Sequence, residues 1–260
     1  MPVPDRWLWL GGSVLIALLA TWATWFLCHW GRSRIWTERL RASPLFSPLL
    51  QAFRFLYYVG GPFAALLWGQ DAIVERLLGL EPLSRLWGVP TSPDEKVALW
   101  MQGVHGVGWV VSLGVPAWVI LALIWWAVRK QNGGESDGLS RSPLIALREA
   151  FFQESHWMFY RNAPVVTLGT YWGTWAGLIP LMLEAGLNPW CWAALRDPKK
   201  RPATLLRAGM AILSAAFYLQ TVSLWLTVLL HWGVTWGVAM WAATLERRRV
   251  GALVDQTCSK

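Results

Sequence analysis

The stretch PLIALREAFFQESHWMFYRN, from Pro143 to Asn162, decides how many times this chain is expected to cross a membrane. Its length matches that of a transmembrane helix, about 20 residues. Five ionisable residues interrupt it: Arg148, Glu149, Glu154, His156 and Arg161. Ionisable groups are costly inside a bilayer and usually face the interior of a helix bundle or a cavity. The rest of the chain must therefore show whether this stretch is a span.

The composition is typical of a polytopic membrane protein. Of the 260 residues, 55% are hydrophobic and only 15% are charged, and the mean hydropathy is +0.36. The apolar residues form long blocks, as in membrane-spanning helices. The net charge of +8 comes from Lys and Arg between these blocks, the pattern of cytoplasmic helix ends, so it requires no nucleic-acid partner. The chain is also rich in tryptophan, with 22 residues that favour an aromatic belt at the membrane surface.

Charge topology favours a span at Pro143 to Asn162. The segment RDPKKRPATLLR, residues 196–207, is the strongest basic loop and is expected on the cytoplasmic side. The apolar block before it, Pro164 to Gly186, must then begin outside. Pro143 to Asn162 must therefore cross from the cytoplasmic side to the outside.

The predicted fold is an all-α membrane helix bundle of about seven spans, or six if the fourth is re-entrant. The expected spans are residues 7–30, 45–69, 97–128, 143–162, 164–186, 205–220 and 224–245, with a tight break near 221–223. Gly60, Gly61 and Pro62 predict a kink in the second span. The N-terminus is expected outside and the C-terminus inside, in a bacterial cytoplasmic membrane.

Four regions follow from this interpretation. Residues 1–130 hold the N-terminal spans and an external interfacial helix within 70–96, residues 131–142 form a polar linker, residues 143–250 hold the C-terminal spans, and residues 251–260 form a tail. The expected partners are membrane lipids and either a membrane-protein substrate or partner subunits.

Helical phasing divides the polar residues of the fourth span between two faces. One face holds Glu149, Gln153, His156 and Tyr160. The other, roughly 140° away, holds Glu154, Met158 and Arg161. Glu154 and Arg161 are two turns apart, roughly 10 Å, so direct pairing is not expected. Arg161 is expected near the outer surface, where its side chain can snorkel.

His231, in the last span, is the strongest candidate partner for these residues. Measured from the cytoplasmic helix ends, Glu154 lies roughly 17 Å deep, His156 roughly 20 Å and His231 roughly 22 Å. The matching depth predicts that two helices build one polar site. A carboxylate and an imidazole there can activate a water, the carboxylate taking its proton and the imidazole polarising a substrate carbonyl. The alternative is a hydrogen bond that only ties the helices together.

No metal or cofactor site is expected, because the three cysteines, Cys28, Cys191 and Cys258, are scattered without zinc-site spacing. One alternative is kept open. His29, His156 and His231 are each followed by Trp, and His105 is flanked by glycines, so a pigment- or haem-binding subunit is a rival interpretation.

The C-terminal half resembles the CPBP family of intramembrane proteases, the CAAX-protease and bacteriocin-processing group. The run TVSLWLTVLLHWGVTW, Thr221 to Trp236, resembles the family's His-x-x-x-Asn motif, with His231 and Thr235 at the two positions. The preceding AILSAAFYLQT resembles its Phe-x-x-x-His helix, with Phe217 and Thr221 at those positions. EAFFQESHWMFYR occupies the place of its Glu-Glu-x-x-x-Arg helix, with Arg161 as the arginine.

The resemblance implies an intramembrane peptidase in which a glutamate and histidines activate water. The residues available for that role are Glu149, Glu154, His156, Arg161 and His231. The glutamate pair, the second histidine and the asparagine of the family are not matched. The resemblance therefore also fits a non-catalytic accessory subunit of a larger bioenergetic or photosynthetic membrane complex.

Overall fold

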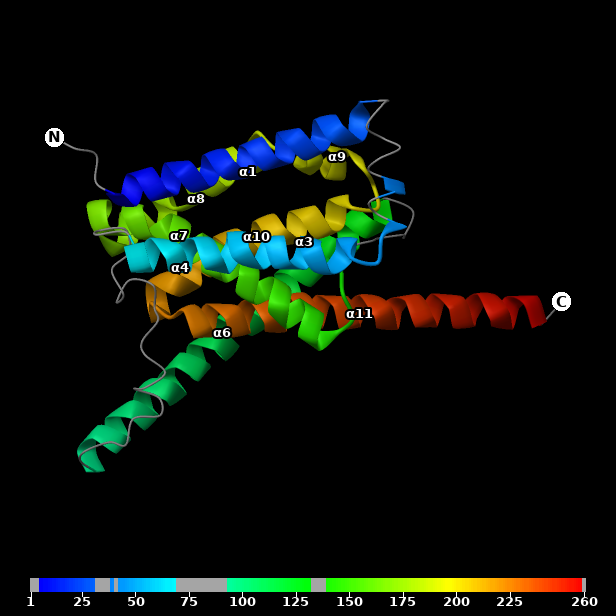
Figure 1. The fold of residues 1–260 in the computed structure, drawn as a ribbon. Coiled ribbons are helices and arrows are strands. Elements are labelled where there is room, and N and C mark those ends of the chain that lie inside the picture. Colours follow the sequence, from blue (N-terminus) through cyan, green and yellow to red (C-terminus); the bar gives the residue numbers. More distant parts are fainter. Residues whose placement is uncertain (1–4, 31–37, 40–41, 69–92, 132–138, 259–260) are drawn as a thin grey trace.

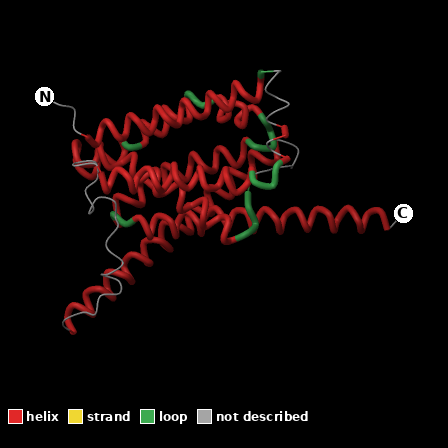
Figure 2. Tube along the Cα trace, in the orientation of Figure 1, coloured by secondary structure: helices red, strands yellow, loops and turns green. Residues whose placement is uncertain are grey.

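A computed structural model describes residues 5–30, 38–39, 42–68, 93–131 and 139–258 (Figure 1). Helices make up nearly all of this part of the chain, and no strand occurs within it (Figure 2). The prediction of an all-α fold is therefore confirmed for the described residues. The helices are α1 (Asp5–His29), α3 (Phe46–Phe55), the π-helix η1 (Leu56–Gly60), α4 (Gly61–Trp68), α6 (Pro93–Gln131), α7 (Pro143–Ala176), α8 (Leu178–Gly186), α9 (Pro189–Arg196), α10 (Arg201–Thr221) and α11 (Leu224–Cys258).

Four stretches of the described helices are long and apolar enough to cross a membrane. They are Asp5–His29, Val104–Lys130, Arg201–Thr221 and Leu224–Leu245. The chain is thus a helical membrane protein, but seven spans are not confirmed. Three predicted spans are not among these four. The second is divided into short helices, the fourth is interrupted by charged side chains, and the fifth, residues 164–186, is broken at Gly169 and divided between α7 and α8.

The α7 segment is a helical hairpin. Gly169 has φ 79° and ψ 168°, a conformation that glycine adopts without steric cost, and the helix is broken there. Beyond the break the chain packs back closely on itself. A Cβ atom at Gly173 would lie 2.2 Å from Val165 Cα, and one at Gly177 would lie 2.5 Å from Arg161 Cγ. The predicted reversal after Asn162 is therefore real but lies further along the chain, at Gly169, with Pro164 inside the first arm.

The predicted kink in the second span is a π-helical turn. The N–H group of Gly61 donates to Leu56 O, five residues back, instead of to the carbonyl four residues back. Pro62 has no N–H group to continue the regular pattern, which gives a local reason for the register change. The turn carries Tyr57 and Tyr58, and η1 packs against α7.

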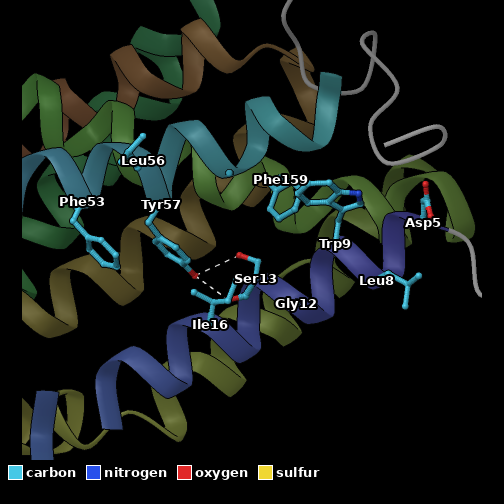
Figure 3. Close-up of a pocket in the computed structure, with 11 residues that line it drawn as sticks. Asp5, Leu8, Trp9, Gly12, Ser13, Ile16, Phe53, Leu56, Tyr57 and Phe159 are labelled. Carbon is cyan, nitrogen blue, oxygen red and sulfur yellow. Dashed lines mark hydrogen bonds between the residues drawn. The ribbon is translucent and has the colours of Figure 1, made fainter. Parts of the chain in front are cut away.

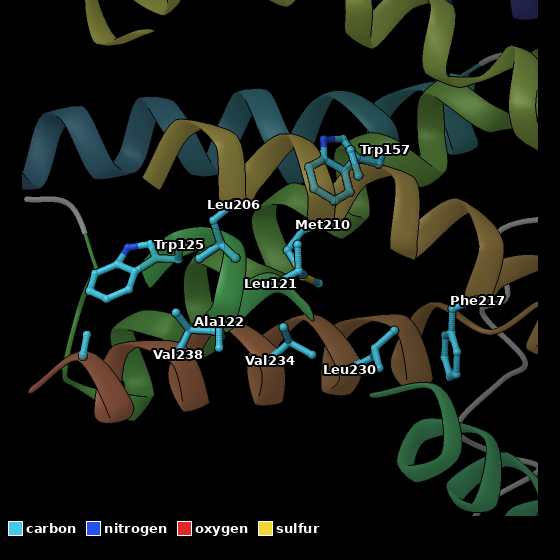
Figure 4. Close-up of a cluster of buried hydrophobic side chains, with 12 residues drawn as sticks. Leu121, Ala122, Trp125, Trp157, Leu206, Met210, Phe217, Leu230, Val234 and Val238 are labelled. Carbon is cyan, nitrogen blue, oxygen red and sulfur yellow. The ribbon is translucent and has the colours of Figure 1, made fainter. Parts of the chain in front are cut away.

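The main hydrophobic core lies between α6, α7, α10 and α11 (Figure 4). Its central side chains include Leu121, Trp125, Met210 and Val238, all buried. A smaller cluster, built around Leu10, Phe159 and Ala163, joins α1 to α7. Many large apolar side chains on α1, α3 and α6 are exposed, as expected for surfaces that face lipid.

The C-terminal boundaries follow the prediction with one exception. The α10 helix ends at Thr221 and α11 begins at Leu224, with Val222 in a left-handed conformation at φ 45°, so the break predicted at residues 221–223 is confirmed. The α11 helix continues to Cys258 and includes most of the predicted tail. Most of the predicted interfacial helix and most of the linker, residues 69–92 and 132–138, lie outside the described residues.

Candidate functional site

A buried carboxylate and imidazole meet between α7 and α11. His231 Nδ1 lies 2.8 Å from Glu154 Oε1, and the relative exposures of the two residues are 3% and 0%. With Nδ1–H donating to the carboxylate, the other ring nitrogen, Nε2, is left as the acceptor. The predicted match in depth between Glu154 and His231 is therefore a direct contact.

Ser214 on α10 completes the contacts of this carboxylate. Its hydroxyl donates to Glu154 Oε2 at 2.5 Å and accepts a hydrogen bond from Arg161 Nη2 at 3.0 Å. Arg161 therefore reaches Glu154 through one bridging hydroxyl. We call Glu154, Arg161, Ser214 and His231 the Glu154 cluster. Because donors point at both carboxylate oxygens, the arrangement suits an ionised Glu154 balanced by the guanidinium.

Three tightly packed helices hold the Glu154 cluster away from lipid and water. The indole of Trp157 stacks on the His231 ring, with centroids 5.2 Å apart and planes at 23°. The Tyr218 ring lies 5.7 Å from the guanidinium carbon of Arg161. Gly177 lets the second arm of α7 pass directly over Arg161. The prediction that Arg161 snorkels to the outer surface is wrong: its side chain is 1% exposed, because the hairpin folds over it.

His156 belongs to a different cluster on the opposite side of α7. Its Nε2 lies 3.4 Å from Glu184 Oε2, which also accepts a hydrogen bond from the Tyr160 hydroxyl at 3.1 Å. The Tyr57 hydroxyl lies 3.3 Å from that of Tyr160, and Ser13 Oγ lies 3.4 Å from the Tyr57 hydroxyl. We call Ser13, Tyr57, His156, Tyr160 and Glu184 the Glu184 cluster.

Glu149 forms an ion pair with α3. Both of its oxygens accept from the Arg54 guanidinium, one of them at 3.0 Å, and Oε1 also accepts from Arg148 Nη2 at 2.9 Å. About a quarter of the Glu149 side chain is exposed, at 26%. The position matches the predicted face of α7 that carries Glu149 and His156, but the carboxylate pairs with the two arginines instead of with a histidine. Its structural role is to tie α3 to α7.

The structure thus divides the five predicted site residues among three places. Glu154, Arg161 and His231 come together, His156 joins Glu184, and Glu149 pairs with Arg54. Ser214 and Glu184 were missed. Phasing on α10 could have found Ser214, since it lies two turns before Thr221 on the same face. Glu184 carried the clearer signal, as the one acidic residue within the apolar block Pro164 to Gly186.

The two threonines at the unmatched motif positions, Thr221 and Thr235, make no hydrogen bond to a side chain of the Glu154 cluster. The Thr221 hydroxyl donates to Phe217 O at 3.1 Å, and the Thr235 hydroxyl donates to His231 O at 2.7 Å. Both hydroxyls therefore bond to carbonyl groups of their own helices.

The remaining histidines and cysteines form no cluster with the Glu154 residues in the described part of the chain. The exposed His105 accepts a hydrogen bond from Trp109 Nε1 at 2.9 Å, and the exposed His29 stacks on Trp25 with centroids 3.9 Å apart. Neither Cys28 nor Cys191 forms a disulfide bond among the described residues. Among the described residues, no group of three or more metal-ligating side chains is found. The pigment- or haem-binding interpretation stays a prediction, which a visible absorption spectrum of the purified protein tests.

Fold and site define a class: a helical membrane protein that buries a glutamate–histidine pair between its C-terminal helices. No protein-family model matches the chain, and neither the curated proteins nor the solved structures contain a significant match to it.

Proposed function

We propose that this protein is a CPBP-like intramembrane hydrolase that cleaves a membrane-anchored peptide at the Glu154 cluster, within a bundle of seven spans. The 2.8 Å contact between Glu154 and His231 is the observation that carries the proposal. The two residues are 77 positions apart in the chain, lie on different helices, and meet inside an apolar core. Keeping such a pair dry is costly unless its groups are hydrogen-bonded, and polar residues within membrane proteins usually serve a function.

The geometry supports catalytic roles for Glu154 and His231 that differ from those predicted from the sequence. Both oxygens of Glu154 already accept hydrogen bonds from Ser214 and His231, so the carboxylate suits the orienting role. It holds the imidazole with Nε2 as the proton acceptor and stabilises the imidazolium after proton transfer. In this scheme His231 Nε2 takes the proton of the attacking water and later returns it to the leaving amine. Arg161 offers a fixed positive charge near the site.

The test is cleavage by protein reconstituted in liposomes with a library of fluorogenic membrane-anchored peptides. Loss of the general base is expected to lower the rate about 10²- to 10⁴-fold, so Glu154→Gln and His231→Ala should both be nearly inactive. Glu149→Gln and His29→Ala are matched controls, because they change the same residue types outside the cluster, and should retain activity. Unchanged cleavage in both cluster variants would disprove the proposal, as would a wild-type protein that cleaves no member of the library.

A second candidate function is a non-catalytic subunit of a larger membrane complex. The observation that favours it is the complete engagement of Glu154 by protein groups, together with the use of Thr221 and Thr235 within their own helices. This candidate predicts purification from native membranes in a stoichiometric complex. It also predicts that Glu154→Gln lowers the stability of the protein, and that the wild-type protein and the variant show the same background level of peptide cleavage.

A further inference from the structure

A long apolar groove lies between α1 and the α3–η1–α4 segment, outside the Glu154 cluster (Figure 3). Its volume is about 550 Å³, and one face of α1, from Asp5 to Ile16, forms one wall. Phe53, Leu56 and Gly61 lie on the other wall, and Phe159 of α7 also lines the groove. Leu56 is 63% exposed and Ile16 is 55% exposed, so apolar side chains are presented along the groove.

The polar side chains in the middle of the groove are already paired. The Tyr57 hydroxyl donates to Ser13 O at 3.2 Å and lies within 3.4 Å of Ser13 Oγ and of the Tyr160 hydroxyl. Both residues belong to the Glu184 cluster, and Tyr160 links them to the Glu184 carboxylate. A bound molecule therefore needs no polar group at this depth, and the groove fits hydrocarbon.

The dimensions of the groove restrict what can fill it. From Asp5 to Ile16 the α1 helix rises about 16.5 Å, roughly half of the ~30 Å hydrocarbon thickness of a bilayer. A volume of 550 Å³ over that length corresponds to a channel about 6.5 Å wide. A partner helix, about 10–12 Å in diameter, would stand largely outside such a channel.

We propose that the groove is a lipid site that binds one acyl chain of a membrane phospholipid, within a single leaflet. The chain lies against the Gly12 face of α1, between Ile16 at the inner end and Leu8 near the outer end. Gly12 leaves room for it, because a Cβ atom there would meet no atom within 4 Å. The site is independent of the proposed hydrolase activity.

Gly11 and Gly12 provide a matched pair of variants for the test. A Cβ atom at either position would meet no atom within 4 Å, but only Gly12 lines the groove. The protein is reconstituted in phosphatidylcholine liposomes that contain a phosphatidylcholine with a photoreactive diazirine on one acyl chain. After irradiation, cross-linked peptides are mapped and quantified. Labelling is expected on α1 and α3.

The Gly12→Leu side chain would displace about two methylene groups of the bound acyl chain. Burial of each methylene contributes about 0.8 kcal/mol to the binding free energy, so the loss corresponds to roughly tenfold weaker binding. Gly12→Leu should therefore lower groove labelling about tenfold, and Gly11→Leu should leave it unchanged. If Gly12→Leu does not fold, as judged by size exclusion, Gly61→Leu fills the groove from the opposite wall and should have the same effect. Equal labelling in the groove-filling and control variants would overturn the proposal.

Tyr57→Phe separates hydrocarbon recognition from polar recognition. It removes the hydroxyl but keeps the ring, and labelling of the groove by the diazirine phospholipid is expected to be unchanged. A large loss of labelling in Tyr57→Phe would show that the groove recognises a polar group and would overturn the assignment to an acyl chain.

Discussion

The two polar clusters on opposite sides of α7 differ in how much of their side chains is exposed. Glu154 and His156 are two residues apart on α7, so their side chains point about 200° apart around the helix axis. In the Glu154 cluster every side chain is nearly inaccessible, Arg161 and Ser214 being 1% exposed. In the Glu184 cluster the Glu184 side chain is 17% exposed, and Tyr57 borders the acyl-chain groove.

This difference shows that the depth of a charged residue in a span does not define its role. The neighbouring helices do. On one side of α7, α10 and α11 supply Ser214 and His231, which complete the contacts of one carboxylate and balance it against Arg161. On the other side, α1, η1 and α8 supply hydroxyl groups and a second carboxylate that lead toward the groove. The first arrangement is closed off from bulk solvent, and the second lies beside the groove.

Breaking the hairpin that builds both clusters should have the largest effect. In Gly173→Ala the new Cβ atom would lie 2.2 Å from Val165 Cα, a clash with backbone that no side-chain rotation relieves. We expect a loss of more than about 4 kcal/mol, so that the variant does not fold at ordinary temperature. Gly186→Ala is the control, because its Cβ atom would meet nothing within 4 Å. Thermal unfolding in detergent measures both, and a Gly173→Ala protein as stable as the control would contradict the hairpin.

Removing the charge at the centre of the closed cluster should have the next largest effect. Glu154→Leu leaves the Arg161 charge buried without its counter-charge, which costs about 3–5 kcal/mol in comparable buried pairs. The double variant Glu154→Leu/Arg161→Met removes both charges and should recover most of that loss. The free energies of unfolding of the two single variants and the double variant form a cycle. Additive effects would mean that the two charges are not coupled through Ser214.

Removing the bridging hydroxyl should have an intermediate effect. Ser214→Ala deletes the donor to Glu154 and the acceptor of Arg161 together, and both partners stay buried. An unsatisfied buried group costs about 1–3 kcal/mol, so the midpoint of thermal unfolding should fall clearly. Ser112→Ala, at an exposed position on α6, is the matched control and should change stability by less than about 0.5 kcal/mol. Equal stability of the two variants would show that the bridge does not contribute.

The corresponding change in the open cluster should have the smallest effect. Glu184→Gln keeps an oxygen that can accept from Tyr160 and His156, and the side chain is partly exposed, so we expect a loss of only about 0.5–1.5 kcal/mol. Glu154→Gln, measured in the same way, should lose more, because its buried partner Arg161 keeps its charge. A larger loss of unfolding free energy in Glu184→Gln than in Glu154→Gln would contradict the distinction between a buried and a partly exposed cluster.

Much of the fold was accessible from local sequence signals. The break between α10 and α11, the disturbed helix around Gly60 and Pro62, and the reversal within residues 143–186 were all expected. The exact reversal point was not, because Pro164 is accommodated inside a helix and the turn depends on Gly169, whose conformation only the packed hairpin reveals. Matching depth pointed to the encounter of Glu154 with His231, but it also grouped His156 with them, because depth along a helix does not specify which neighbouring helix a side chain faces.

By itself, the sequence showed that the chain has the composition of a membrane protein. It also gave the approximate limits of its helices and the depths at which its polar residues lie along them. Only the tertiary structure decided that His156 and Glu149 belong elsewhere, that Ser214 bridges Arg161 to Glu154, and that Arg161 is buried rather than directed to the surface. The physical reason is that helix periodicity specifies height and facing direction within one helix. The choice of which helices face one another depends on contacts between residues far apart in the chain, such as those of Glu154 with Ser214 and His231.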